Sequence, residues 1–310
     1  MRVASLLPSA TEMVHFAGAT DALVGVTHEC DFPEGVQRLP KLTASKIDHH
    51  EMSSSEIDEA VGRLSDEDSI YALDAELLEE LSPDLIVTQG LCEVCAVSEN
   101  VVERAISALD ARPDLLSLNP TSLDEVMEDA VRVGDALGRG DETRSKVEAL
   151  KRRLARVEES VSGATPPRVG CIEWLDPPFS AGHWVPEMVK LAGGEDLFAE
   201  PGEPSRRMRW KEVFEASPEV LVLMPCGFDV ERTMKEVHAL AELPGWRDVP
   251  AVRDGRVWVV DANSYFSRPA PRLVEGVETL ARVLHPEAFV DTPEPADALR
   301  ITPALLEAEF

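Results

Sequence analysis

Cys92 and Cys95 form the sharpest chemical motif in the sequence, a Cys-x-x-Cys pair. Two thiolates at this spacing can hold zinc or an iron centre, or can cycle as a redox pair. His28 and Cys30 would complete a set of four sulfur and nitrogen donors. There is no second Cys-x-x-Cys pair, and free cysteines also pack as small hydrophobic residues. The motif therefore predicts a zinc or iron site formed by Cys92, Cys95, His28 and Cys30, with simple packing as the alternative.

A second group of residues combines aromatic rings with polar side chains, in segments that we expect to be loops. Aromatic faces bury a flat ligand well, and an imidazole can meet the polar edge or the metal of such a ligand. Packing is the alternative, since the tryptophans could fill an interface between lobes and Arg268 could pair with an acid. The candidate ligand-binding residues are His28, Glu29, Cys30, Glu173, Trp174, His183, Trp184, Phe228, Tyr265 and Arg268.

Other polar residues have simpler interpretations. Ser9 and Glu12 form an S-x-x-E capping box, which predicts that a helix begins there. His49 and His50 lie in an acidic loop and are expected to face solvent, although a histidine pair can bind metal. The common nucleotide-binding, hydrolase and metalloprotease motifs are absent from the sequence, so we expect a protein that is not an enzyme.

The elements that would position these residues follow an α/β pattern. Because ligands of open α/β sheets bind beyond the carboxyl ends of the strands, the loops after the strands are the candidate site. The last twenty residues are acidic and contain prolines, which predicts a surface tail with one short helix. The predicted strands cover residues 2–7, 22–26, 84–88, 168–172, 217–225 and 257–261, and the predicted helices cover 9–18, 122–137, 141–161, 186–193 and 272–284.

The second half of the sequence repeats features of the first. Residues 187–193 (EMVKLAG) resemble residues 12–18 (EMVHFAG), and residues 217–225 (SPEVLVLMP) resemble residues 82–90 (SPDLIVTQG). The two matches occur in the same order on either side of the predicted helix 141–161. This arrangement predicts two similar α/β lobes joined by a single long helix, with a ligand cleft between the lobes. The expected domains are an N-terminal lobe over 1–120, connecting helices over 121–162 and a C-terminal lobe over 163–310.

The composition restricts the partners and the environment of the protein. The chain has 310 residues and a formal net charge of −28, from 58 acidic and 30 basic residues, of which only seven are Lys. Such an excess of acid repels nucleic acid and anionic lipid, and it suits solubility in concentrated salt. No apolar stretch is long enough to enter a membrane. The first residues lack the features of a secretory signal, which predicts a cytoplasmic protein, or an extracytoplasmic one if the native start lies upstream.

The order of elements resembles that of the class III substrate-binding proteins, the transporter components that bind cobalamin, iron-siderophores and metal ions. The resemblance covers nearly the whole chain. It is closest to the branch labelled cobalamin-binding protein, in the strings HECDFP (28–33), LCEVCAVS (91–98), EWLDPPFSAGHWVPE (173–187), PCGFD (225–229) and SRPAPRLVEG (267–276).

The resemblance implies a binding protein that holds a metallated small molecule, cobalamin or a related corrinoid, in the cleft and delivers it to an ABC permease. The residues themselves leave a second hypothesis open. In that hypothesis the chain is a cytosolic zinc or iron–sulfur protein, or an enzyme, centred on Cys92 and Cys95 with His28 and Cys30. The metal content of the purified protein distinguishes the two.

Overall fold

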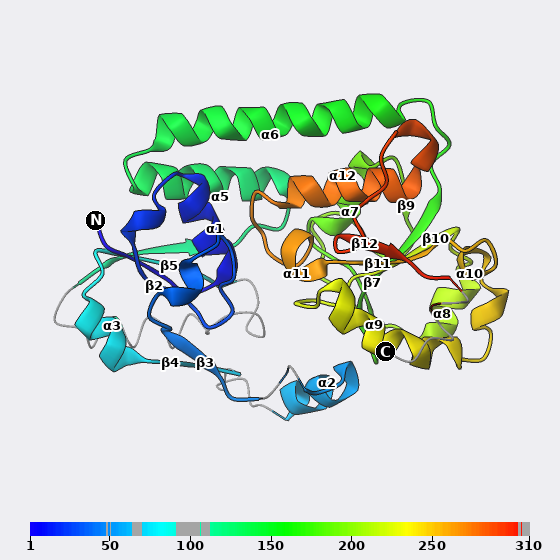
Figure 1. Ribbon diagram of the computed structural model, residues 1–310, viewed down its shortest axis with the longest axis horizontal. Coiled ribbons are helices and arrows are strands. Elements are labelled where there is room, and N and C mark those ends of the chain that lie inside the picture. Colours follow the sequence, from blue (N-terminus) through cyan, green and yellow to red (C-terminus); the bar gives the residue numbers. More distant parts are fainter. Residues whose placement is uncertain are drawn as a thin grey trace. The chain divides into compact units, whose positions relative to one another are not determined.

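The computed structural model describes residues 1–47, 49, 51–63, 70–90, 106, 112–302 and 305, and Figure 1 traces these residues from β1 to β12. They fold into two compact units. Unit 1 consists of Met1–Met52, Glu56–Pro120 and Asp124–Ala149, and unit 2 consists of Ser53–Ser55, Thr121–Leu123 and Leu150–Phe310. Each unit contains a mainly parallel sheet and helices, which confirms the predicted α/β fold with two lobes.

Unit 1 is built on a four-stranded sheet in the order β2-β1-β5-β6, in which every neighbouring pair is parallel. A cluster of buried hydrophobic residues in this unit includes Leu6, Leu42 and Ile86. A separate antiparallel pair, β3 and β4, completes the strands of the unit. The strands of unit 1 are β1 (Val3–Ser5), β2 (Leu23–Gly25), β3 (Thr43–Ser45), β4 (Tyr71–Leu73), β5 (Leu85–Gln89) and β6 (Asp114–Leu118). The helices that lie wholly or partly in unit 1 are α1 (Pro8–Phe16), α2 (Ser54–Gly62), α3 (Ala75–Leu81), α5 (Leu123–Ala136) and α6 (Gly140–Val161).

The predicted capping box at the start of α1 is wrong. The residue that caps the helix is Leu7, whose backbone is extended, and Pro8 occupies the first turn. Proline suits this position because it has no N–H group to leave unsatisfied and its φ angle is already helical. Ser9 and Glu12 therefore lie inside the helix, and Glu12 is buried.

Unit 2 is built on a larger sheet in the order β12-β11-β10-β7-β8, with β9 pairing beside the start of β7. β7, β10 and β11 are parallel, so their carboxyl ends share one edge. The strands of this unit are β7 (Arg168–Leu175), β8 (Pro178–Ser180), β9 (Glu195–Asp196), β10 (Val220–Leu223), β11 (Val257–Val260) and β12 (Ala298–Arg300). Its helices are α7 (Val185–Leu191), α8 (Trp210–Glu215), α9 (Val230–Ala241), α10 (Pro250–Arg253), α11 (Ala262–Tyr265) and α12 (Leu273–Leu284).

The sequence repeat corresponds to a repeat of local geometry. The two matching E-M-V segments lie in α1 and α7, and the two matching S-P segments lead into β5 and β10. Ser82 and Ser217 both take a left-handed backbone conformation, with φ of 41° and 52°, and so do Gly18 and Gly193, with φ of 77° and 82°. Both units therefore turn the chain in the same way before these strands and after these helices.

The predicted long helix is present as α6, a single uninterrupted helix in Figure 1. Its first part, up to Ala149, belongs to unit 1, and the part from Leu150 belongs to unit 2. Arg153 fixes the second part, because its guanidinium binds Glu275 and Glu278 of α12 at 2.9 Å each. The hydrogen bond to Glu278, with the neighbouring Glu275, raises the pKa of Arg153, so the second part of α6 is joined to α12 by charge-assisted hydrogen bonds.

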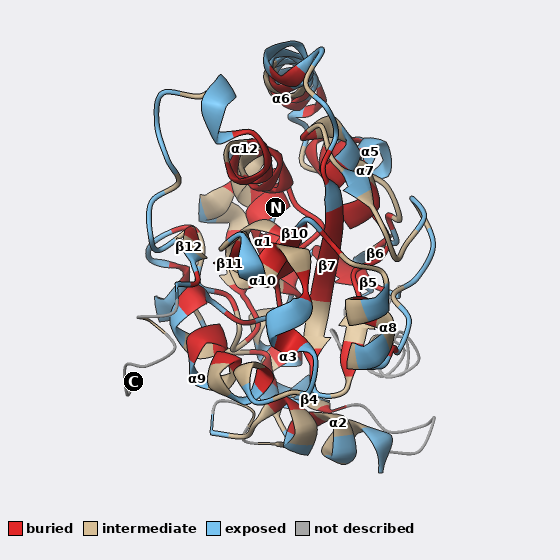
Figure 2. Ribbon diagram, turned by 90° about the vertical axis from the view of Figure 1, so that its right-hand side faces the viewer, coloured by how far each residue is buried: buried red, intermediate tan, exposed pale blue. Residues whose placement is uncertain are grey.

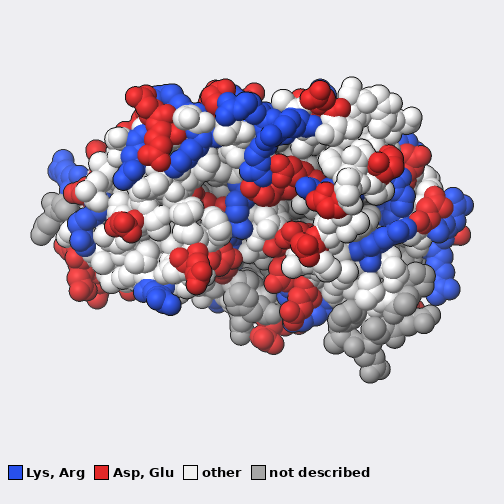
Figure 3. Space-filling model, turned by 45° about the horizontal axis from the view of Figure 1, so that its top comes forward, with Lys and Arg blue, Asp and Glu red and all other residues white. Residues whose placement is uncertain are grey.

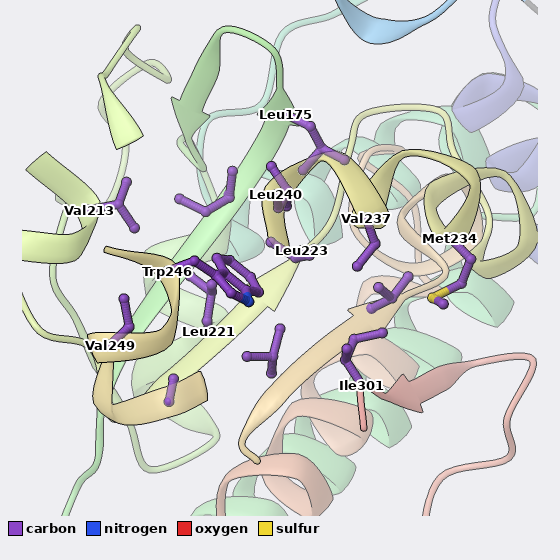
Figure 4. Packing of buried hydrophobic residues seen from close by; sticks show 14 of the residues in the cluster. Leu175, Val213, Leu221, Leu223, Met234, Val237, Leu240, Trp246, Val249 and Ile301 are labelled. Carbon is purple, nitrogen blue, oxygen red and sulfur yellow. The ribbon is translucent and has the colours of Figure 1, made fainter. Parts of the chain in front are cut away.

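The C-terminal segment is more than a surface tail. Ala298–Arg300 forms β12, which pairs antiparallel with β11 and adds an edge strand to the sheet of unit 2. Ile301 is buried and joins the main hydrophobic core of that unit. Figure 4 shows this core, in which Trp246 lies against Leu221 and Leu223 of β10.

The burial pattern of β7 points to the edge at which a ligand could bind. In Figure 2 the strand is buried along most of its length and becomes more accessible toward its carboxyl end, at Glu173 and Trp174. On the face seen in Figure 3, acidic and basic side chains lie interspersed. Among the described residues, none of the helices is both long enough and apolar enough to cross a membrane.

Candidate functional site

The carboxyl edge of unit 2 brings together the loops that follow β7, β10 and β11. Two backbone hydrogen bonds connect these segments. The Cys226 N–H donates to Glu173 O and the Asn263 N–H donates to Phe228 O, each at a distance of 3.0 Å. The predicted residues therefore lie at one edge, with Glu173 and Trp174 near the end of β7, Phe228 in the loop after β10 and Tyr265 at the end of α11.

Trp174 and Phe228 form the aromatic centre of this edge. Their ring centroids are 5.4 Å apart, with the planes tilted by 57°. The Trp174 Nε1–H donates to Ser54 O at 3.1 Å, and the Arg232 guanidinium lies 4.3 Å from the centre of the Phe228 ring. Two adjacent rings with a cation beside them suit a flat, partly anionic ligand.

Tyr265 and Arg268 have partners inside unit 2. Burial, together with nearby Asp297, raises the pKa of Tyr265 to about 12, so the phenol stays protonated at neutral pH. Arg272 lies over its ring at 5.6 Å. Arg268 is only 7% exposed and its Nη2 donates to Asn263 Oδ1 at 2.8 Å. This geometry holds the loop after β11 in place, and it does not offer an open guanidinium fork to a ligand carboxylate.

His183 and Trp184 lie on the loop between β8 and α7. Trp184 is 6% exposed and its Nε1–H donates to Phe266 O at 2.7 Å. His183 has a left-handed backbone with φ of 53°, and burial lowers the pKa of its imidazole. The buried Trp184 side chain therefore connects this loop to Phe266, the residue after α11. This geometry favours packing over ligand contact as the role of Trp184.

In unit 1, His28 and Glu29 form a cluster with His49. Glu29 Oε1 lies 3.2 Å from Nε2 of His28 and 3.0 Å from Nε2 of His49. Burial opposes the charge on Glu29, but its close contacts with the two imidazoles hold its pKa well below the usual value. Nδ1 of His28 also bonds the Thr43 hydroxyl at 2.8 Å. The expectation that His49 faces solvent is wrong, because Glu29 draws its ring into this cluster.

Cys30 is enclosed within unit 1. Its side chain is 2% exposed, and its sulfur lies 3.1 Å from the hydroxyl oxygens of both Thr11 and Thr27. The Thr11 hydroxyl in turn donates to Ser5. Such a buried polar network is typical of a structural thiol, and it does not present the sulfur to a ligand.

The predicted metal site falls partly outside the described residues. Cys92 and Cys95 lie there, so the predicted set of Cys92, Cys95, His28 and Cys30 stays a prediction. His50 of the predicted histidine pair also lies outside the described residues. In the part of the chain that the structure describes, no three or more His, Cys, Asp or Glu residues form a group that could hold a metal. Cys30, Cys171 and Cys226 are free cysteines.

The sequence analysis missed Arg232, Glu236 and Ser54, which surround the aromatic pair. The Arg232–Glu236 ion pair, at 3.0 Å, has the i, i+4 spacing of a helix, so this pair could have been predicted from the sequence. Glu236 also accepts hydrogen bonds from the Ser54 backbone N–H at 3.0 and 3.2 Å. These two residues are 182 positions apart, so no local pattern links them.

Asp196 is a second residue that the sequence did not single out. Its Oδ1 accepts the backbone N–H groups of Phe198 at 2.8 Å and Ala199 at 3.0 Å, and the Cys171 thiol lies beside it. Burial raises its pKa to about 6, because the cost of enclosing the charge exceeds the gain from these hydrogen bonds.

Asp196→Asn is expected to stabilise the protein at alkaline pH. A carboxyl whose folded pKa is raised favours folding when protonated, so this contribution is lost as pH rises from about 4 to about 6. Above pH 7 the loss reaches about 2–3 kcal/mol, and the neutral amide avoids it while keeping Oδ1 as an acceptor. Urea unfolding at pH 8 and pH 4.5 should show a gain at pH 8 that shrinks at pH 4.5. The exposed neighbour Glu195→Gln is the control, and an equal effect of Asp196→Asn at both pH values would contradict the assignment.

Comparisons with known proteins agree with this fold over almost the whole chain. A vitamin B12-binding protein of Vibrio cholerae is 22% identical over 290 residues, covering 91% of this chain and 88% of that protein. An uncharacterised ABC transporter substrate-binding lipoprotein of Bacillus subtilis, YvrC, is 25% identical over 296 residues, covering 93% and 81%. The solved apo structure of the periplasmic heme-binding protein RhuT of Roseiflexus sp. RS-1 has a TM-score of 0.70 at 21% identity. It covers 93% of this chain and 99% of that one, which shows a shared fold.

The chain belongs to the periplasmic binding protein family, whose family model matches residues 3–264. This membership confirms the class to which the sequence was assigned, a substrate-binding protein and not an enzyme.

Proposed function

We propose that this protein binds cobalamin or a related corrinoid through the loops at the carboxyl edge of unit 2. The Trp174–Phe228 pair carries the proposal, because two adjacent rings at 5.4 Å match the flat faces of a metallated macrocycle. The vitamin B12-binding relative from Vibrio cholerae, similar over 91% of the chain, supports the choice of a corrinoid. Ligand contacts by Glu173 and Tyr265 are part of the proposal, and those predicted for His28 and Glu29 stay predictions.

Heme is the second candidate ligand. RhuT, with the same fold and a TM-score of 0.70, is a heme-binding protein. Heme is also flat and metallated, so the same aromatic pair would accept it. The nearby Arg232 favours a ligand that carries negative charge, which holds for the heme carboxylates and for the cobalamin phosphate alike.

We further propose that the protein acts outside the cytoplasmic membrane and delivers its ligand to an ABC permease. The YvrC relative is described as a substrate-binding lipoprotein of an ABC transporter, which supports this assignment. Fractionation of the native cells tests it: the protein should appear in the extracytoplasmic fraction. Recovery with the cytosolic fraction would contradict this location and would favour the cytosolic metal-protein hypothesis.

The ligand that co-purifies with the native protein tests the proposed function. Elemental analysis combined with mass spectrometry of the denatured protein should find cobalt and a corrinoid in equal amounts. Iron with a porphyrin mass would favour heme. Stoichiometric zinc or iron without any macrocycle would contradict the proposal and support a centre at Cys92 and Cys95.

Trp174→Ala is expected to weaken binding of cyanocobalamin by about 1–3 kcal/mol, or ~5- to 150-fold, because a large apolar contact is lost. Trp174→Phe is the matched control, since it keeps a ring but loses the bond to Ser54. It should bind at least as tightly as the wild type. Isothermal titration calorimetry measures both variants, and equal affinities of Trp174→Ala and wild type would place the ligand elsewhere.

A further inference from the structure

Five residues of unit 2, including Trp174 and Phe228, form a closed ring of contacts in which each residue contacts the next. The Trp174 indole donates to Ser54 O at 3.1 Å, and the Ser54 N–H donates to Glu236 at 3.0 Å. Glu236 pairs with Arg232 at 3.0 Å, and Arg232 lies 4.3 Å from the Phe228 ring. Phe228 returns to Trp174 at 5.4 Å. The ring therefore links both aromatic residues to the short segment Ser53–Ser55.

Glu236 holds this segment through several bonds. Its carboxylate accepts both the N–H and the hydroxyl of Ser54 as well as the Arg232 guanidinium. Ser54 is also the first residue of α2, where a negative charge is favoured by the helix dipole. Ser54 is 1% exposed, so the contact is closed to solvent.

The ring leaves little of the aromatic pair for a ligand. Phe228 is 5% exposed, with Arg232 over one face, and the single N–H of Trp174 is already bonded to Ser54. A macrocycle that stacks on Phe228 must displace Arg232, which is held by Glu236, and Glu236 is in turn bonded to Ser54. Only three residues of this part of the chain, Ser53–Ser55, belong to unit 2, and a short segment of this kind can open locally without unfolding of the whole unit.

We infer that Ser53–Ser55 is a clasp that competes with the ligand for the Trp174–Phe228 pair, so that ligand binding requires the clasp to open. This inference rests on the proposed function, because it concerns the same aromatic site. The apparent affinity is then the intrinsic affinity reduced by the fraction of molecules in which the clasp is open. A clasp that is closed in about 90% of molecules lowers the apparent affinity ~10-fold.

Glu236→Gln tests the clasp, because glutamine keeps the size of the side chain but removes the charge that binds Ser54 and Arg232. Glu231→Gln is the matched control, an exposed residue on the same helix. Hydrogen-exchange mass spectrometry on the ligand-free full chain reports the opening of the peptide that contains Ser54. Titration with cyanocobalamin and with hemin reports the affinity of the site. We expect Glu236→Gln to raise the exchange rate ~10-fold and to tighten probe binding by ~3- to 10-fold, with Glu231→Gln unchanged.

The outcomes separate failure of the clasp from failure of the proposed function. If a probe binds the wild type and Glu236→Gln alters neither its affinity nor the exchange of Ser54, the clasp is overturned while the function stands. Faster exchange with weaker probe binding would also overturn it, since the segment would then support the ligand. Binding to Glu236→Gln alone would support a clasp that is fully closed in the wild type. If neither probe binds either protein, the proposed function fails and the clasp falls with it.

Discussion

Replacing Trp184 by alanine is expected to lower the free energy of unfolding by about 3–5 kcal/mol, the range for removing a buried tryptophan. The side chain is 6% exposed, and the loss of its N–H would leave the Phe266 carbonyl without this 2.7 Å hydrogen bond. This expectation follows the packing alternative for Trp184 that the sequence analysis set beside ligand contact. Urea unfolding of the ligand-free protein measures the effect.

Trp184→Phe is the informative control for this variant. It keeps most of the buried area but leaves the Phe266 carbonyl unpaired, so it should cost about 1–3 kcal/mol. Unchanged stability in Trp184→Ala, together with loss of ligand binding, would return Trp184 to the ligand site and contradict its assignment as a packing residue.

Trp246→Ala is expected to destabilise the protein by a similar amount, about 3–5 kcal/mol, for a different reason. Trp246 is 2% exposed in the core of unit 2 (Figure 4). The centroid of its ring lies 6.5 Å from that of Trp210 and 6.3 Å from that of Phe214. Removing it leaves a cavity among β10 side chains that the rigid sheet cannot close.

The phenylalanine variant should behave differently at this position. Among the described residues, the buried Nε1 of Trp246 has no hydrogen-bond partner. Trp246→Phe therefore loses no hydrogen bond and should cost less than Trp184→Phe under the same conditions. If Trp246→Phe were the more damaging of the two, ring volume and not hydrogen bonding would control both sites.

The sequence was sufficient to predict the α/β fold, because its signals are local and repeated. The S-P segments at Ser82 and Ser217 and the glycines at Gly18 and Gly193 impose the same left-handed turns in both units. The sequence-based predictions were wrong where two local signals competed for one position, or where an element depends on residues far apart in the sequence. Helix α1 begins at Pro8, whereas the capping box predicted a start at Ser9. The pairing of β12 with β11 depends on contacts between residues far apart in the sequence.

The site was less predictable, since burial of a side chain is decided by the whole unit. The sequence places Trp174, Trp184 and Cys30 equally in loops, yet only Trp174 keeps partial exposure at the carboxyl edge of β7. The contact between Ser54 and Glu236 crosses 182 positions and leaves no periodic signal. The predicted adaptation of the acidic surface to salt stays a prediction.

Direct titration of the ligand-free wild type with cyanocobalamin tests the central claim, that the protein binds a corrinoid. The proposal predicts saturable binding with one corrinoid per chain, accompanied by a decrease in tryptophan fluorescence because Trp174 lies at the site. Absence of saturable binding, or binding of hemin in its place with no competition from cyanocobalamin, would contradict it.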